Sequence, residues 1–218
     1  MYKIIKTKKL AEMIYLMDIE APWVAKKCEP GQFIIAKIDE KGERIPLTIC
    51  DYDRSRGVIT IVFQAVGVST EKMAKLKTGD SFSAFTGPLG NAAKFITEDI
   101  EILSKKKILF VAGGIGAAPI YPQVKWLFQK GISADVIVGS RTKDVLILKE
   151  QLETVAGNLY IATNDGSIGY CGMVTDVIKQ LVEKEGKSYD SCITIGPMVM
   201  MKFVSLLTKE LGIRWTRI

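Results

Sequence analysis

The stretch ILFVAGGIGAAPIYPQVKWL, residues 108–127, decides the fold class of this 218-residue chain. A continuous apolar run ends in the turn GGIG at 113–116, and an alanine-rich segment with helical spacing follows. An apolar strand that enters a helix in this way is typical of a parallel sheet covered by helices. Backbone amides and a helix start at such a turn attract phosphate, and glycines let a ligand approach the backbone closely. A tight turn without a ligand is the alternative, because GGIG departs from the GxGxxG pattern.

The residues after 104 repeat the alternation of apolar strand and amphipathic helix. Strands are expected at 108–113, 134–140, 158–165 and 191–197, and helices at 118–131, 173–187 and 198–212. The segments that end these strands are small or polar, as in GSRTKD (139–144), TNDGSIGYCG (163–172) and GPM (196–198). Ligands of α/β proteins bind beyond the carboxyl ends of parallel strands. We therefore predict an α/β parallel-sheet domain that binds a nucleotide.

The first half of the chain has a different pattern. Short β-rich runs at 13–20, 32–38, 46–52, 57–66 and 80–85 are separated by turn formers, and only 69–76 looks helical. Strands at this spacing favour a small antiparallel β-barrel. The sequence thus predicts two domains, a β-barrel at 1–103 and an α/β domain at 104–218, with the lysine run at 105–107 as the linker between them.

Composition excludes several classes of function. The chain has no histidine, which excludes histidine-based catalysis and histidine-ligated metal, and its four cysteines form no CxxC pair, so no metal site is predicted. The net charge of +6 lies mostly in the second half, without a basic and aromatic cluster typical of nucleic-acid binding. Charged side chains occur throughout residues 1–22, which is unlike a signal peptide or a membrane span. We expect a cytoplasmic protein.

Seven motifs in order resemble the ferredoxin-reductase superfamily of flavoproteins. They are RIPLTI (44–49), GVST (67–70), GPLGN (87–91), GGIGAAP (113–119), GSRTKD (139–144), TNDGSIGYCG (163–172) and IGPMVMM (195–201). Within that superfamily the chain is similar to two electron-transfer subunits. One belongs to NAD-linked dihydroorotate dehydrogenase, and the other is the small subunit of NADH-dependent ferredoxin:NADP oxidoreductase.

The resemblance implies that FAD binds to the barrel. The residues implied to line the flavin are Arg44, Pro46, Leu47 and Thr48, with Arg44 at the diphosphate and Thr48, the catalytic candidate, near the isoalloxazine N5. Backbone amides and hydroxyls for the same diphosphate are implied at Gly67, Val68, Ser69 and Thr70. Arg44 stands four residues before Thr48, whereas the arginine of the family pattern stands three residues before its threonine or serine.

A nicotinamide nucleotide is implied for the second domain. Its turn consists of Gly113, Gly114, Gly116, Ala117 and Pro119, with Arg141, Asn164, Asp165, Gly196, Pro197 and Met198 around the rest of the cofactor. Arg141 suits the 2′-phosphate of NADP(H), whereas the similar subunits favour NAD(H), and we favour NAD(H). Of Met198, Met200 and Met201, two are expected to pack in the core rather than touch the cofactor.

The implied function is hydride transfer between NAD(P)H and FAD, followed by electron transfer to a larger flavin or iron–sulfur subunit or to a ferredoxin. Such chemistry needs no protein acid or base, which suits a chain without histidine. The alternatives are a self-contained NAD(P)H:flavin or ferredoxin reductase and a non-catalytic assembly subunit. The similar subunits carry a cysteine-rich C-terminal segment that holds a [2Fe–2S] cluster, whereas this chain ends in GIRWTRI (212–218). We therefore expect no cluster in this polypeptide.

Overall fold

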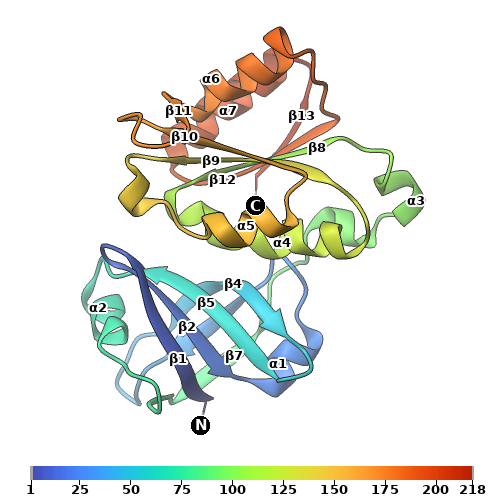
Figure 1. Ribbon diagram of the computed structural model, residues 1–218. Helices are drawn as coiled ribbons and strands as arrows, with labels where there is room; N and C mark the ends of the chain where they lie inside the picture. The colour runs from blue at the N-terminus through green and yellow to red at the C-terminus, as the bar shows by residue number, and fades with distance from the viewer. Residues whose placement is uncertain (1, 218) are drawn as a thin grey trace. The chain divides into compact units, whose positions relative to one another are not determined.

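The computed structural model describes residues 2–217, which form two compact units that divide between Lys94 and Phe95 (Figure 1). The first unit contains an antiparallel sheet and the second a parallel sheet with helices, as the sequence predicts. The assignment of residues 1–103 to FAD and 104–218 to a nicotinamide nucleotide stays a prediction.

The first unit is a nearly closed barrel of seven antiparallel strands in the order β6-β1-β2-β5-β4-β3-β7. Its strands are β1 (Tyr2–Ala11), β2 (Ile14–Glu20), β3 (Phe33–Lys37), β4 (Ile45–Asp53), β5 (Val58–Gln64), β6 (Ser81–Phe82) and β7 (Ala84–Leu89), and its helices are α1 (Pro22–Lys27) and α2 (Val68–Ala74). Only Ser83 separates β6 from β7, the two ends of this strand order, and its amide donates to the carbonyl of Lys37. The chain therefore turns from one end of the sheet to the other and brings the barrel close to closure.

Alternating side chains build the barrel core. On β5, the side chains of Ile59, Ile61 and Phe63 point into one buried cluster together with Met17 and Ile19 of β2. This spacing of two residues is what places one face of a strand against a core. The apolar alternation read from the sequence thus becomes the inward face of the barrel.

Two strands of this unit were not predicted from sequence. The charged N-terminal residues form β1, which pairs with β2 along its length, and four lysines on this strand hid its apolar alternation. The segment 85–91, which contains the motif GPLGN, lies largely in β7, which pairs with β3 and holds a cis Gly87–Pro88 peptide bond. β7 ends the strand order, and an edge strand tolerates proline because its outer N–H needs no partner.

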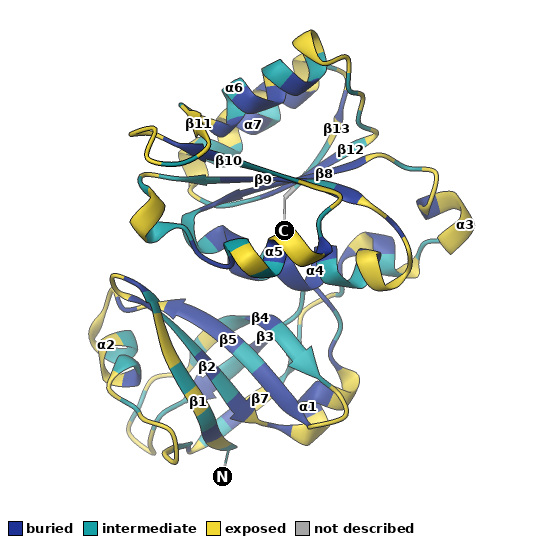
Figure 2. Ribbon diagram, in the orientation of Figure 1, coloured by how far each residue is buried: buried dark blue, intermediate teal, exposed yellow. Residues whose placement is uncertain are grey.

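The second unit is a parallel sheet in the order β11-β10-β9-β8-β12-β13. Its strands are β8 (Ile108–Gly113), β9 (Ala134–Ser140), β10 (Asn158–Thr163), β11 (Tyr170–Cys171), β12 (Ser191–Ile195) and β13 (Arg214–Arg217). Every residue of β8 is buried, because neighbouring strands and helices cover it on all sides (Figure 2).

Helices cover both faces of this sheet, with α4 and α5 on one face and α6 and α7 on the other (Figure 1). The helices are α3 (Ile100–Leu103), α4 (Ala117–Gln129), α5 (Lys149–Val155), α6 (Val174–Lys179) and α7 (Met198–Glu210), and α6 continues as one π-helical segment at Gln180–Lys184. The sequence analysis missed the short α3, α5 and β11, and also β13. β13 pairs in parallel with β12, and Trp215 packs against the core beside Cys192.

The lysine run at 105–107, interpreted as a solvated linker, is tied to the second unit. Lys106 forms an ion pair with Glu98, and the amide of Lys107 donates to the carboxylate of Asp190 over 2.7 Å. Within the part of the chain that the structure describes, no helix has the length and apolar character needed to cross a membrane.

Candidate functional site: two glycine turns

The carboxyl ends of four parallel strands meet at one edge of the second sheet. Gly113 at the end of β8 pairs with Gly139 on β9, and Ser140 pairs with Thr163 at the end of β10. On the other side, Ala112 pairs with Ile195, which ends β12. The turns that follow these strands were predicted separately from sequence, and the sheet register brings them together.

The three glycines of the GGIG turn have different surroundings. A Cβ atom on Gly116 would lie 2.2 Å from the carbonyl oxygen of Ile195, and one on Gly113 would lie 2.5 Å from Sδ of Met200. These two positions therefore need glycine for packing between strand ends. Gly114 has a φ of +54° and nothing within 4 Å of where its Cβ would be. Its backbone is thus the open part of the turn.

The same turn leads directly into α4. Residues Gly114–Gly116 form one 3₁₀ turn, and the amide of Ala117 donates back to the carbonyl of Gly114. No side chain caps α4, and no acidic residue lies in its first turn. A helix start of this kind attracts anions, because the first amides of a helix lack acceptors within it and the positive end of the helix dipole lies there. Ala117, which is buried, and Pro119 both lie in the first turn of α4, directly after the glycine turn.

The loops after β9 and β10 are joined by backbone hydrogen bonds. The amide of Asn164 donates to the carbonyl of Ser140 over 3.2 Å, and that of Asp165 donates to the carbonyl of Arg141 over 3.3 Å. The structure therefore places Arg141, which is exposed, next to Asn164 and Asp165. The hydroxyl of Ser167 donates to the carboxylate of Asp165 over 2.7 Å and lowers the pKa of that carboxyl. The Asp165 side chain is thus engaged in its own turn.

A second group of predicted residues meets at one end of the barrel. The hydroxyl of Ser69, in the first turn of α2, donates to the carboxylate of Glu43, which precedes Arg44. This contact brings the segment before β4 to the turn after β5. Glu43 was not predicted from sequence, because its contact with Ser69 depends on the pairing of β4 with β5.

Within β4 the predicted residues point in two directions. Leu47 packs against the barrel core, whereas Pro46 and Thr48, its neighbours on either side, occupy the opposite face of the strand. Thr48 pairs with Phe33 of β3. A ligand lying on that outer face would meet Pro46 and Thr48 through their side chains and Leu47 through its backbone.

The turn at Gly67 is built by the Thr70 side chain. Its hydroxyl oxygen accepts from the amides of Val66 and Gly67, each over 3.0 Å, and donates to the carbonyl of Gly67 over 2.9 Å. The Thr70 hydroxyl is therefore occupied by the turn itself. A Cβ atom on Gly67 would meet nothing within 4 Å, so this backbone is open, like that of Gly114.

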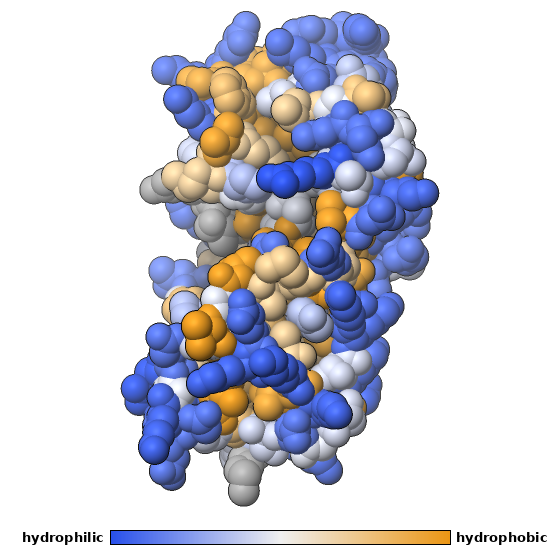
Figure 3. Space-filling view, turned by 90° about the vertical axis from the view of Figure 1, so that its left-hand side faces the viewer, coloured by the Kyte–Doolittle hydropathy of each residue, from blue (hydrophilic) through white to orange (hydrophobic). Residues whose placement is uncertain are grey.

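Apolar side chains are exposed on either side of Gly67 and at the start of α7. Val66 and Val68 flank Gly67 with 68% and 71% of their surface exposed, and Met198 at the start of α7 is 73% exposed. Figure 3 shows apolar patches of this kind, in orange, interrupting a surface that is otherwise largely hydrophilic. Exposed apolar groups next to open backbone are suited to cover the rings of a bound ligand.

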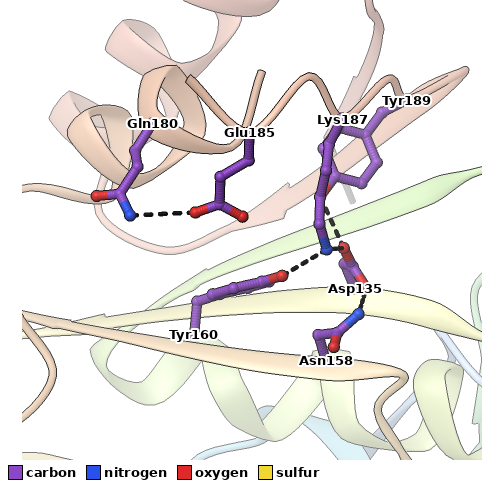
Figure 4. A network of polar contacts seen from close by, with 7 residues as sticks. All are labelled: Asp135, Asn158, Tyr160, Gln180, Glu185, Lys187 and Tyr189. Atoms are coloured by element: carbon purple, nitrogen blue, oxygen red, sulfur yellow. Dashed lines mark hydrogen bonds and ion pairs between the residues drawn. The ribbon is translucent and has the colours of Figure 1, made fainter. Parts of the chain in front are cut away.

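A polar network lies at the other edge of the second sheet, where β9 and β10 begin (Figure 4). The carboxylate of Asp135 accepts from Lys187 Nζ over 2.9 Å, from the Tyr189 hydroxyl over 2.7 Å and from the Asn158 amide over 2.7 Å. Burial alone raises the pKa of Asp135, but these hydrogen bonds outweigh it and lower the pKa. These groups are hydrogen-bonded to one another, so the network holds the loop before β12 against the sheet.

The cysteines offer no obvious chemistry. Cys28, Cys50 and Cys192 are buried, and Cys171 is exposed. Burial raises the pKa of both the Cys28 and the Cys192 thiol to about 12, so each stays protonated near neutral pH. Among residues 2–217, no three His, Cys, Asp or Glu side chains gather in a way that would hold a metal ion. The expected absence of an iron–sulfur cluster remains a prediction.

An antiparallel barrel followed by a parallel sheet with a glycine turn after its central strand defines a two-domain protein of the ferredoxin-reductase type. No family model matches the chain. Among solved structures, the chain is similar to a chain of the NADH-dependent reduced ferredoxin-NADP oxidoreductase, a structure described in connection with flavin-based electron bifurcation. It superposes with a TM-score of 0.90 at 34% identity, over 100% of this chain and 75% of that one.

Sequence relatives agree with this similarity. The dihydroorotate dehydrogenase B (NAD(+)) electron transfer subunit homolog of Thermotoga maritima is 36% identical over 211 residues, which are 97% of this chain and 71% of that protein. An uncharacterized protein in the adh 3′ region of Clostridium beijerinckii is 59% identical over 99% of this chain and 73% of its own length. The chain therefore belongs to the family of dihydroorotate dehydrogenase B electron transfer subunits, and the resemblance inferred from its motifs is confirmed.

Proposed function

We propose that this chain is an electron-transfer subunit of a flavin-dependent oxidoreductase. It binds FAD on the barrel and a nicotinamide nucleotide on the parallel sheet, and it passes electrons to a larger redox subunit or a ferredoxin. The observation that carries the proposal is the pair of open glycine turns, at Gly67 and Gly114, in a chain of this family. Each turn offers backbone with room beside it at a helix start, as a diphosphate requires.

Bound FAD and nicotinamide nucleotide would supply the hydride and single-electron chemistry, and the chain would position them. The amides of the 114–116 turn would hold the diphosphate of the nucleotide, with Arg141, Asn164 and Asp165 beside its ribose. NAD(H) is the nucleotide that we favour, because the similar subunits carry NAD in their names. No protein acid or base is needed, in keeping with a chain without histidine.

On the barrel, Pro46, Leu47 and Thr48 would lie along the flavin. The Thr48 hydroxyl would donate to the flavin N5 and polarise it, which is the role that we assign to this residue in catalysis. The positive charge of Arg44 and the amides of Val68 and Ser69 would stabilise the diphosphate. Thr70 would contribute by fixing the turn, because its hydroxyl is already occupied within that turn.

An absorbance spectrum of the purified chain tests the proposal directly. We expect a flavin spectrum, with FAD released on denaturation, that bleaches when NADH is added without oxygen. A colourless chain that does not take up FAD would overturn the proposal. A yellow chain that neither NADH nor NADPH bleaches would instead indicate a non-catalytic assembly subunit.

The partner is tested separately. Light scattering of the chain with a candidate larger subunit from the same organism should give a stable complex, and electron transfer to that subunit should require it. Rapid NADH-dependent reduction of free flavin by the chain alone, without a partner protein, would favour a self-contained reductase. Iron and acid-labile sulfide analysis should detect no stoichiometric cluster.

A further inference from the structure

Two glycines from different turns approach each other closely at the carboxyl edge of the parallel sheet. Gly113 ends β8, and Gly196 follows β12. A Cβ atom on Gly196 would lie 3.0 Å from both Cα and N of Gly113. At this separation a side chain on Gly196 would press on the neighbouring backbone, so the two glycines are direct neighbours at the ends of the paired strands β8 and β12.

The side chain of Met200 covers both glycines on the side where their Cβ atoms would be. Its Sδ atom lies 2.5 Å from the position of a Cβ on Gly113, and its Cε atom lies 2.6 Å from that of a Cβ on Gly196. Met200 is half-buried in the first turn of α7 and packs against the core of the second unit. One thioether therefore touches both glycines and connects them to the helix that follows the second turn.

Methionine adapts its shape easily, and here its Sδ and Cε atoms pack against two different turns. A shorter side chain would leave both glycines uncovered on this side. Because α7 is anchored by the buried Val204 and Leu207, its first turn holds Met200 against both turns. The position of α7 thereby supports the backbones of both turns from one side.

We propose that Met200 is a positioning residue for the nicotinamide nucleotide. It acts by packing against both the Gly113–Gly114 turn and the Gly196–Pro197 turn and supporting their backbones from one side, without touching the cofactor itself. This inference rests on the proposed function, in which both turns contact the same nucleotide. A shift of about 1 Å in a binding loop can cost far more affinity than the loss of one contact.

The first test compares dissociation constants for NADH in variants of the flavin-loaded protein. Met200→Ala should weaken binding about tenfold, because both turns lose the side chain that supports them. Met200→Leu preserves volume and should stay within about twofold of the wild type. Met201→Ala is the matched control, since Met201 is not among the atoms nearest to either glycine, and its affinity should not change.

A double-mutant cycle tests the contact itself. Gly113→Ala places a methyl group against Met200 and should weaken NADH binding strongly in the wild-type background. In Met200→Ala the nearest remaining atom is Cδ of Pro197 at 2.9 Å, so the same change should cost much less. Coupling of about fivefold or more between the two substitutions is expected for residues in direct contact.

Different results would overturn different claims. If the wild-type protein binds neither NADH nor NAD⁺, the proposed function fails, and the role of Met200 fails with it. If the wild type binds NADH, equal dissociation constants for Met200→Ala and Met201→Ala overturn the role of Met200 alone. A Met200→Ala variant that lowers the turnover rate but leaves the dissociation constant unchanged would also contradict a positioning role in nucleotide binding.

Discussion

The Nζ atom of Lys187 lies 2.9 Å from the carboxylate of Asp135 and 2.5 Å from the hydroxyl of Tyr160. Asp135 is near the start of β9, whereas Lys187 belongs to the loop that follows the π-helical segment after α6. The contact thus joins segments that are 52 residues apart in sequence. It fixes the loop that leads into β12, the strand that ends in the second turn of the candidate nucleotide site.

Asp135→Asn should lower the free energy of unfolding by about 2 kcal/mol, because it removes the charge that three donors share. The folded state lowers the pKa of Asp135. Its contribution is therefore complete above the ordinary pKa of 3.8 and is lost as the pH falls through the lower, folded-state value. Urea unfolding near neutral pH and at decreasing acid pH should show the difference between wild type and variant shrinking in acid.

The control is Glu153→Gln, which breaks the exposed ion pair with Lys149 on α5. That change should cost less than about 0.5 kcal/mol, as is usual for exposed pairs one helical turn apart. Equal losses for the two variants would show that the network around Asp135 gives no more stability than a surface ion pair.

The glycines of the GGIG turn should respond differently to alanine. Gly116→Ala places a methyl group against the carbonyl of Ile195 and should destabilise the fold by about 3 kcal/mol. Gly114→Ala has space, and its positive φ should cost only about 1 kcal/mol. The second variant should therefore stay folded yet bind NADH more weakly, which thermal unfolding and a binding titration measure together. A folded Gly114→Ala protein with unchanged affinity would contradict contact between this turn and the nucleotide.

The fold was predictable because its hydrophobic patterns are strong. The run 108–113 becomes the fully buried β8, and the alternation at 57–66 becomes β5 of the barrel. Strands were not predicted where charged residues interrupt the apolar alternation or where the segment is short. Lysines hid β1, and the tail around Trp215 was too short for its strand to be recognised, since β13 depends on pairing with β12 rather than on local sequence.

Only part of the candidate site was visible in the sequence. The chain order of motifs pointed to Gly113, Gly114 and Gly116 as one turn, but their separate surroundings depend on β12 and α7, which come about 80 residues later. Thr70 has the residue type expected of a ligand contact, yet its hydroxyl is engaged in the turn. Glu43 reaches Ser69 only because β4 and β5 are paired, and spacing along the chain carries no sign of this contact.

Glu43 places a negative charge beside the proposed flavin diphosphate. Glu43→Gln should therefore tighten FAD binding about threefold, as expected when repulsion between exposed like charges is removed. Glu40→Gln is a suitable control, because the described contact of Glu40 uses its backbone carbonyl and not its side chain. Fluorescence titration of the flavin-free protein at low and high salt measures the effect, which should decrease as salt screens the charges. Weaker binding by Glu43→Gln would indicate instead that its contact with Ser69 shapes the site.

Arg141 should decide how the protein distinguishes the two nicotinamide nucleotides. It is exposed in the loop after β9, and the amide of Asp165 donates to its backbone carbonyl, so its guanidinium is free to follow a ligand. A guanidinium recognises a 2′-phosphate by paired hydrogen bonds, which NADH does not offer. Arg141→Ala should therefore raise the dissociation constant for NADPH about tenfold and that for NADH less than about twofold, whereas Arg141→Lys should recover part of the NADPH affinity. Anaerobic titrations with both nucleotides measure this ratio, and a large selective loss of NADH binding would mean that Arg141 holds the nucleotide through a group that both cofactors share.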